Sequence, residues 1–222
     1  MTTLENNMGN FSLIITAGGS SSRYGKNKLL EEINGRTVIE HSVNAFLNFE
    51  EIKEIIIPTN ENFIKDFKTI FSDERVQIIN GGNSRQESVY NALQLVTCEY
   101  VIIHDGARPL IKEAVISQVI DMVQTHNAVS VMTKTTDTIK KVNENGQIIK
   151  TIDRSQLYNT QTPQAFRSEI ILSAHEQLKK QQFTDDASML EELDIPVFIV
   201  NGSYTNIKIT TKSDLDFAKL YI

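Results

Sequence analysis

Phe11-Ser12-Leu13-Ile14-Ile15-Thr16-Ala17-Gly18-Gly19-Ser20-Ser21-Ser22-Arg23-Tyr24-Gly25-Lys26-Asn27-Lys28 is the stretch that decides the fold of this chain. Its first five residues are an apolar run that predicts a buried strand, and the remainder is a loop of small residues carrying three cations. Glycines let backbone N–H groups approach phosphate oxygens, and arginine and lysine neutralise their charge. The stretch indicates either a phosphate site at a strand end or an ordinary turn with solvated basic residues.

The spacing within this loop excludes two common nucleotide-binding motifs. Five residues separate Gly19 from Gly25, and Asn27 follows Lys26, so the Walker A pattern is absent. The run from Gly18 to Ser22 does not fit the dinucleotide fingerprint either. A phosphate held here needs a different loop geometry.

Composition limits the class of protein. With 222 residues, 40% of them hydrophobic and 23% charged, the chain can bury a full core as one domain. A net charge of −6 argues against broad binding to nucleic acid or to anionic membranes, which favour basic surfaces. Any anionic ligand must therefore be held by local cations.

Targeting and redox signals are few. The single cysteine, Cys98, cannot form an internal disulfide, and no Cys/His cluster has metal-ligand spacing, so a cytoplasmic location is the simplest. Residues 1–10 read as a flexible leader without the features of a signal peptide. No apolar run approaches the roughly 18 residues of a membrane span.

Apolar runs of strand length alternate with segments of helical periodicity. The predicted strands are Phe11–Ile15, Ile55–Pro58, Val76–Ile79, Tyr100–His104, Val129–Thr133 and Val197–Val200. Helical faces between them include Ile39 with Val43, Val89 with Leu93, and Ile116 with Ile120. This alternation predicts an α/β fold with a mostly parallel sheet covered on both faces. Ligands of such sheets bind at the carboxyl ends of strands, where the Gly18 loop lies.

One segment breaks the alternation. Residues 137–154 contain Asn145-Gly146 between two β-rich arms, which predicts a hairpin. A two-stranded arm is marginal alone in water, so it packs either on a second copy of the chain or back on its own domain. No linker marks a second domain, and we expect one domain over residues 1–222 with a β-arm at about 135–160.

Polar side chains follow other predicted strands. Asp105 comes directly after Tyr100–His104, where it could hold Mg²⁺ against phosphate oxygens or simply cap its turn. His104 reads as a packed histidine rather than a catalytic base. Ser84 with Glu87 predicts a capping box at the start of a helix.

Eight segments together resemble, in the same order, the 2-C-methyl-D-erythritol 4-phosphate cytidylyltransferases over about residues 11–220. They are Thr16-Ala17-Gly18 with Arg23 and Lys28; Gly81-Gly82 with Arg85-Gln86 and Ser88-Val89; His104-Asp105-Gly106-Ala107-Arg108-Pro109; Asp137-Thr138; Thr151-Ile152-Asp153-Arg154; Gln161-Thr162-Pro163-Gln164-Ala165-Phe166; Thr184-Asp185-Asp186-Ala187-Ser188; and Asn206-Ile207-Lys208-Ile209-Thr210.

The resemblance implies a Rossmann-like nucleotidyltransferase fold and a homodimer joined by the β-arm. The implied reaction joins CTP and 2-C-methyl-D-erythritol 4-phosphate into the CDP-alcohol, releasing pyrophosphate, on the non-mevalonate route to isoprenoids. Mg²⁺ or another divalent cation is the implied cofactor. Because a phosphate monoester is already nucleophilic, the protein has to align and neutralise two polyanions.

The resemblance also implies a role for individual residues. Those implied for catalysis are Arg23, Lys28 and Lys208. Those implied to bind the nucleotide are Thr16, Ala17, Gly18, Gly19, Gly82, Asn83 and Ser88. Those implied to bind the substrate are Asp105, Arg108 and Thr184, with Thr138 and Arg154 reaching the partner subunit's site; Asp105 is also the implied metal residue.

Some positions depart from the family pattern or admit a second interpretation. Leu29 follows Lys28 where glutamine is usual, the loop before Lys28 is about two residues short, and Asn83 stands where an acid is common. Lys26 competes with Lys28 for the same role. A ribitol-5-phosphate cytidylyltransferase and a non-catalytic nucleotide-binding relative are the alternative functions.

Overall fold

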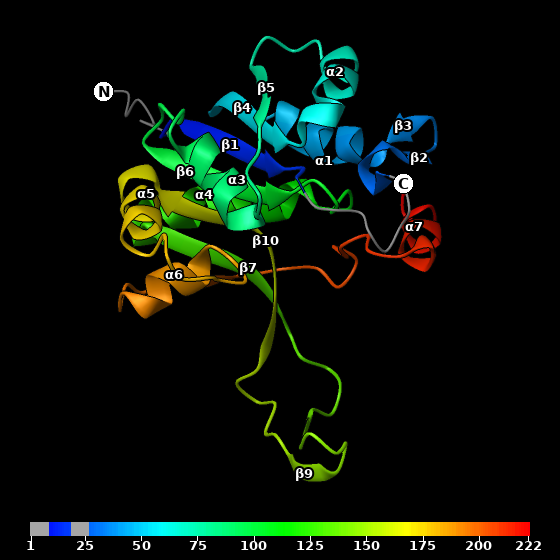
Figure 1. Ribbon diagram of the computed structural model, residues 1–222, viewed down its shortest axis with the longest axis vertical. Helices are drawn as coiled ribbons and strands as arrows, with labels where there is room; N and C mark the ends of the chain where they lie inside the picture. The colour runs from blue at the N-terminus through cyan, green and yellow to red at the C-terminus, as the bar shows by residue number, and fades with distance from the viewer. Residues whose placement is uncertain (1–8, 19–26) are drawn as a thin grey trace, which may run out of the picture.

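A computed structural model describes residues 9–18 and 27–222. A seven-stranded sheet in the order β11-β7-β10-β6-β1-β4-β5 forms its centre (Figure 1). Its strands are β1 (Phe11–Thr16), β4 (Ile52–Thr59), β5 (Val76–Asn80), β6 (Tyr100–Asp105), β7 (Ala128–Lys134), β10 (Tyr158–Arg167) and β11 (Phe198–Asn201). All neighbours are parallel except β10, which is antiparallel to both β6 and β7. The predicted mostly parallel α/β fold is confirmed.

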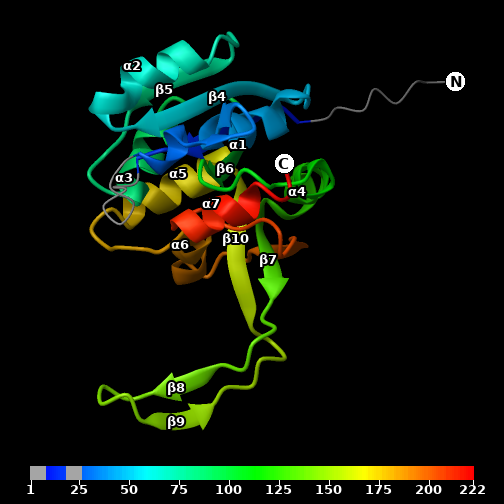
Figure 2. The same cartoon turned by 90° about the vertical axis from the view of Figure 1, so that its right-hand side faces the viewer.

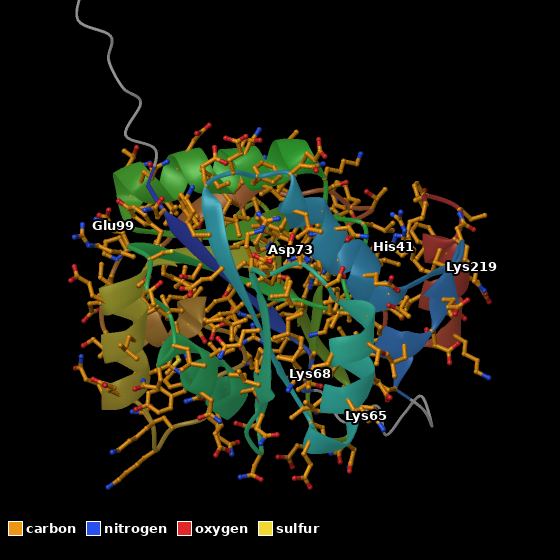
Figure 3. The ribbon with its side chains drawn as sticks, turned by 90° about the horizontal axis from the view of Figure 1, so that it is seen from above. His41, Lys65, Lys68, Asp73, Glu99 and Lys219 are labelled. Atoms are coloured by element: carbon orange, nitrogen blue, oxygen red, sulfur yellow. The ribbon has the colours of Figure 1, made fainter. Side chains whose placement is uncertain are left out.

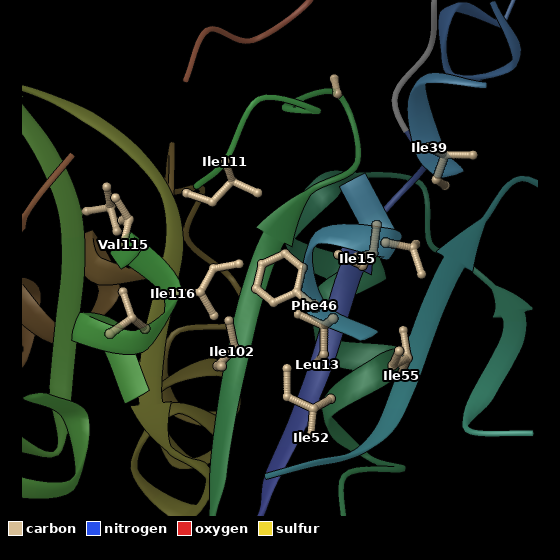
Figure 4. Packing of buried hydrophobic residues seen from close by; sticks show 14 of the residues in the cluster. Leu13, Ile15, Ile39, Phe46, Ile52, Ile55, Ile102, Ile111, Val115 and Ile116 are labelled. Carbon is tan, nitrogen blue, oxygen red and sulfur yellow. The ribbon is translucent and has the colours of Figure 1, made fainter. Parts of the chain in front are cut away.

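Helices cover both faces of this sheet. They are α1 (Val38–Leu47), α2 (Glu61–Ile70), α3 (Arg85–Leu93), α4 (Glu113–His126), α5 (Ser168–Gln177), α6 (Ala187–Glu192) and α7 (Lys212–Ala218). Because side chains alternate along a strand, Leu13 and Ile15 of β1 join the core under α1 and α4, whereas Ile14 joins the core under α3 and α5. Figure 4 shows the first of these cores around Phe46.

Every strand predicted from an apolar run is present with slightly different ends, but one strand of the central sheet and the short pair β2 and β3 were not predicted. β10 lies in the middle of the sheet although its sequence is polar and contains Pro163. Gln161, Thr162 and Gln164 can be buried there because each has a hydrogen-bond partner, on a neighbouring strand for Thr162 and Gln164 and at the Ser203 carbonyl for Gln161. A strand whose buried side chains are polar and hydrogen-bonded has no apolar run from which it could be predicted.

The predicted hairpin is confirmed as β8 (Lys140–Val142) paired with β9 (Ile148–Thr151). Its turn begins earlier than the Asn145-Gly146 pair suggests, because Asn143 Oδ1 accepts from the N–H groups of Asn145 and Gln147. Gly146 supplies the positive φ that ends the turn. Figures 1 and 2 show this arm extending away from the sheet below β7 and β10, rather than folding back on it.

The chain order places a crevice at the carboxyl ends of β1 and β6. From β1 the chain passes through a short 3-10 helix η1 (Lys28–Leu30), a small hairpin of β2 (Glu32–Ile33) and β3 (Arg36–Thr37), and α1 into β4 and then β5. It then returns through α3 to β6, on the other side of β1. Open α/β sheets bind ligands where the strand order reverses in this way.

The two ends of the described chain lie on the body of the protein. Of the predicted leader, residues 1–8 lie outside the described residues, while the Gly9 N–H donates to Gln124 Oε1 at 2.9 Å. Within residues 9–18 and 27–222, no helix has the length and apolar character needed to cross a membrane.

Candidate active site

The site begins where β1 and β6 end side by side. Thr16 and Asp105 are paired across these two parallel strands, and Thr16 Oγ1 donates to Asp105 Oδ1 at 3.2 Å. The Gly106 N–H then donates to the Thr16 carbonyl at 3.1 Å, and a Cβ on Gly106 would lie only 3.1 Å from that oxygen. A side chain at this position would therefore push the two strand ends apart by a few tenths of an ångström.

Three cations surround the Asp105 carboxylate. Lys208 Nζ lies 2.7 Å from Oδ2, Arg85 Nε lies 3.4 Å from Oδ1, and Arg108 Nε lies 3.7 Å from Oδ2. The Asp105 side chain is only 7% exposed. Burial alone would raise the pKa of the Asp105 carboxyl, but Arg85, Lys208 and Arg108 outweigh it and hold that pKa well below its usual range. Asp105 is therefore ionised across physiological pH.

The backbone of Asp105 is linked to the buried ring of His104 through the hydroxyl group of Thr162. The Asp105 N–H donates to Thr162 Oγ1 at 3.0 Å, and Thr162 Oγ1 lies 3.1 Å from His104 Nδ1. His104 Nε2 lies 3.1 Å from the Arg108 carbonyl. Burial lowers the pKa of His104 to about 4, so the ring is neutral near pH 7, with the proton on Nε2 and Nδ1 accepting from Thr162. The interpretation of His104 as a packed histidine is confirmed.

A C-terminal segment brings Lys208 to this cluster. Asn206 is fully buried and donates from Nδ2 to the Thr162 carbonyl at 2.9 Å, while its own carbonyl accepts from Arg108 Nη1 at 2.7 Å. The Ile209 N–H donates to the Ala107 carbonyl at 2.8 Å. Lys208 lies between these two anchored residues, so its side chain is directed at Asp105.

A second loop packs tightly against the first. The Gly82 N–H donates to Ser88 Oγ at 2.9 Å, and a Cβ on Gly18 or Gly81 would lie 3.1 or 2.9 Å from that same oxygen. Ser84 caps α3 as expected, since its Oγ accepts from the Glu87 N–H. The reciprocal bond of the predicted capping box is absent, because the Glu87 carboxylate accepts from the Asn83 N–H instead.

Two adjoining pockets share this cluster. The first is lined by Thr16, Gly18, Lys28, Leu29, Arg85, Ser88, Asp105, Ala107 and Lys208. The second is lined by Arg85, Asp105, Arg108, Thr160, Gln161, Thr162, Gln164, Thr184, Asp185, Ser188, Glu191 and Lys208. Arg85, Asp105 and Lys208 form the wall between them. The arrangement suits two phosphorylated ligands that meet at a shared cationic wall.

Most of the predicted site residues within the described chain gather around these pockets. Ala17, Gly82 and Asn83 lie in the two loops beside the first pocket but do not line it. Thr138 and Arg154 lie on the exposed arm and line neither pocket. Gly19, Arg23 and the competing Lys26 lie outside the described residues.

Sequence reasoning assigned no role to Arg85, Gln164 or Asp186. Arg85 lines both pockets from the first position of α3, where the helix dipole disfavours a cation. That misplaced charge was a signal available in the sequence. Gln164 and Asp186 could not be recognised, because their role depends on contacts between distant segments.

The residues around Asp105 do not form a metal site by themselves. Both carboxylate oxygens already face cations, and the residues that the structure describes contain no group of three or more His, Cys, Asp or Glu side chains able to hold a metal. Magnesium favours several oxygen ligands, usually one or two carboxylates together with phosphates and water. A divalent cation beside Asp105 would therefore need further oxygen ligands from phosphate or water.

A mostly parallel sheet, with paired pockets and a cationic wall at the switch point of its strands, fits an α/β nucleotidyltransferase fold. The sequence model of the family described as 2-C-methyl-D-erythritol 4-phosphate cytidylyltransferase matches residues 11–222. The chain belongs to this family.

Individual relatives agree with that assignment. A 2-C-methyl-D-erythritol 4-phosphate cytidylyltransferase of Bacillus mycoides is 42% identical over 96% of this chain and 97% of the relative. The crystal structure of a 4-diphosphocytidyl-2C-methyl-D-erythritol synthase from Anaerococcus prevotii matches with a TM-score of 0.87 and 32% identity, covering 97% of this chain and 96% of that one. A cytidylyltransferase structure from Francisella tularensis matches with a TM-score of 0.84 and 28% identity, covering 96% and 100%.

Proposed function

We propose that this chain transfers the cytidylyl group of CTP to 2-C-methyl-D-erythritol 4-phosphate, giving 4-CDP-2-C-methyl-D-erythritol and pyrophosphate. The observation that carries the proposal is the wall of Arg85, Asp105 and Lys208 between two pockets. The family membership identifies the two ligands, and the wall supplies the cations that two phosphorylated reactants need at their meeting point.

The chemistry is an in-line displacement. An oxygen of the methylerythritol phosphate attacks the α-phosphorus of CTP, a new P–O bond forms, and the bond to the β-phosphate breaks with its electron pair leaving on pyrophosphate. No side chain has to act as a nucleophile, and the protein contributes alignment and charge stabilisation. Lys28 lines the first pocket and Lys208 lines both, so we assign both lysines, with Arg23, to the charge that develops on the phosphates.

The first pocket is assigned to CTP and the second to the acceptor. Thr16, Gly18 and Ser88 line the first pocket, and Ala17, Gly19, Gly82 and Asn83 are assigned to the same nucleotide on the family pattern. Arg108 and Thr184 line the second pocket beside Asp105. Because Asp105 is ionised and fixed by three cations, its carboxylate can accept hydrogen bonds from the hydroxyl groups of the methylerythritol substrate. The same charge repels a misplaced phosphate.

The β-arm is proposed to join two copies of the chain. It exposes large apolar side chains, which are costly in water unless a partner covers them. They are Ile139, Val142, Ile148 and Ile149, exposed by 36, 52, 62 and 56%. Thr138 and Arg154 lie on the same arm, and we propose that they enter the partner subunit's site. A homodimer would then be needed for full activity.

Mg²⁺, or another divalent cation, is proposed to arrive with CTP rather than to reside in the protein beforehand. The phosphates of CTP offer the oxygen ligands that the Asp105 cluster lacks, and a bound cation would neutralise part of their charge. The cytoplasm remains the proposed location, on the basis of the single cysteine.

Pyrophosphate release from CTP and Mg²⁺ tests the proposal. We expect release with 2-C-methyl-D-erythritol 4-phosphate and little with D-ribitol 5-phosphate under the same conditions. Preference for ribitol phosphate would move the chain to that alternative activity. Absence of release with both acceptors, alongside measurable CTP binding, would support a non-catalytic nucleotide-binding protein.

A further inference from the structure

Asp186 is a buried carboxylate whose partners differ from those usual for an acidic residue at a helix N-terminus. It is the N-cap residue of α6, yet its side chain makes no capping hydrogen bond and is only 1% exposed. Gln164 of β10 takes over the cap, since its Oε1 accepts from the N–H groups of Asp186 and Ala187 at 3.1 Å each. The Asp186 carboxylate is thereby left for other partners.

Those partners are Arg85 and His175. Arg85 Nη1 lies 2.8 Å from Asp186 Oδ2, and His175 Nε2 lies 3.3 Å from Asp186 Oδ1. His175, on α5, is also only 1% exposed, and its ring stacks near Tyr90 of α3 with 6.2 Å between centroids. Burial would raise the pKa of Asp186, but Arg85 and His175 outweigh it and lower that pKa. A charged carboxylate is thus fixed behind Arg85.

Arg85 needs such support because of where it lies. It occupies the first turn of α3, where the dipole repels a cation, and its side chain spans from Asp186 to Asp105, with Nε 3.4 Å from Asp105 Oδ1. A free arginine side chain has many rotamers, and one held at both ends has few. Since Arg85 lines both pockets, its orientation sets the shape of the wall that the two ligands share.

We propose that Asp186 and His175 are positioning residues, which hold the Arg85 guanidinium at the wall between the nucleotide pocket and the acceptor pocket. The inference rests on the proposed cytidylyl transfer for its kinetic consequence only. The geometric consequence, a restrained Arg85 side chain, can be measured without any turnover.

Kinetics of Asp186→Asn form the first test. The asparagine side chain of this variant has nearly the shape of aspartate but lacks the charge opposite Arg85. We expect kcat/KM to fall on the order of 10²-fold, because a misplaced contact near reacting groups has an effect of this size. Asp73→Asn is the matched control: it breaks an Asp–Arg pair, with 2.9 Å between Arg75 Nη2 and Asp73 Oδ2, in the loop before β5 (Figure 3). The control should keep wild-type kcat/KM.

A double-mutant cycle separates positioning from general damage. In an Arg85→Gln background there is no guanidinium to hold, so adding Asp186→Asn should change kcat/KM by less than about threefold. A loss of equal size in both backgrounds would overturn the proposal, as would a folded Asp186→Asn enzyme within threefold of wild type. If Asp186→Asn does not fold, His175→Gln, which keeps the carboxylate, enters the same cycle and should give a smaller loss that likewise disappears.

The arginine Nε–H resonances of ¹⁵N-labelled protein give the readout that is independent of activity. The Arg85 signal is assigned by its absence in Arg85→Gln. We expect Asp186→Asn to shift or broaden it, while Asp73→Asn leaves it in place. An unchanged signal in Asp186→Asn would overturn the proposal. Absence of pyrophosphate release by the wild type would instead defeat the proposed function and leave this spectral test intact.

Discussion

The buried imidazole of His104 should make the protein lose stability in mild acid. His104 is fully buried and neutral, and burial lowers its pKa to about 4, against an ordinary value of about 6.5 in an unfolded chain. Between these two values the unfolded chain binds a proton that the folded chain does not. The unfolding free energy therefore rises with pH in this window and falls as the pH falls through it.

The size of the effect follows from the two pKa values. Each unit of pKa difference corresponds to about 1.4 kcal/mol, so the complete loss is about 3 kcal/mol, of which about 2 kcal/mol falls between pH 7 and pH 5. That interval lies above the range in which carboxylates such as Asp105 and Asp186 take up protons in the unfolded chain. The loss at pH 5 to 7 therefore reports histidines.

Urea unfolding at fixed protein concentration across pH 5 to 7 measures this loss in the wild type and in His104→Asn. The variant keeps an acceptor near the position of Nδ1, and its unfolding free energy should depend less on pH by about 2 kcal/mol over the interval. His126→Asn, which removes a histidine that stacks on Phe198, should keep the wild-type dependence, because the buried imidazole is still present. Identical pH dependence in wild type and His104→Asn would refute the reasoning.

Four further outcomes are expected. Lys28→Ala should lower kcat on the order of 10²- to 10³-fold, as for loss of one preorganised transition-state contact, and near-normal turnover in steady-state assays would remove Lys28 from the mechanism. Gly81→Ala should raise KM for CTP about tenfold, because its Cβ would lie 2.9 Å from Ser88 Oγ and 3.3 Å from the Thr59 carbonyl; an unchanged KM would show that the loop is not needed in this position. Mixing inactive Lys28→Ala and Arg154→Ala proteins should restore about a quarter of wild-type activity, since half of the sites in each mixed dimer are intact; no recovery after subunit exchange would argue against shared sites. EDTA should abolish turnover but leave the melting temperature of the ligand-free protein unchanged, whereas a fall in melting temperature would indicate a resident metal.

Local signals explain which parts of the fold were predictable. Runs such as Phe11–Ile15 and Tyr100–His104 predict strands because a parallel strand buried on both faces must be apolar throughout. The hairpin around Gly146 was predictable because turn residues act over a few positions. β10 was not predictable in the same way, since Gln164 is buried by virtue of Ser130, Asp185 and the start of α6.

The candidate site was predictable only in part, for a related reason. Loop residues such as Gly18 and Lys28 are adjacent in sequence, so their chemistry can be read together. The wall joins Arg85, Asp105 and Lys208, which are far apart in the chain and meet only through the order of strands in the sheet. The family pattern gave roles to two of these three residues. The position of Arg85 at a predicted helix start was a local signal, but its contacts with Asp105 and Asp186 required the structure.

A buried carboxylate between two anion pockets needs a physical explanation, because it repels the ligands that those pockets are proposed to hold. Arg85, Arg108 and Lys208 would repel one another if Asp105 were absent, and their attraction to Asp105 fixes their spacing before any ligand arrives. Because the pKa of Asp105 is far below its usual range, protonation cannot remove this negative charge at physiological pH. We therefore expect the phosphates of CTP and of the acceptor to approach the wall from its two sides, where Arg85 and Lys208 offer each of them a cation. Three cations around one carboxylate leave the cluster with net positive charge, so in the proposed reaction it favours the close approach of the acceptor phosphate to the α-phosphorus of CTP.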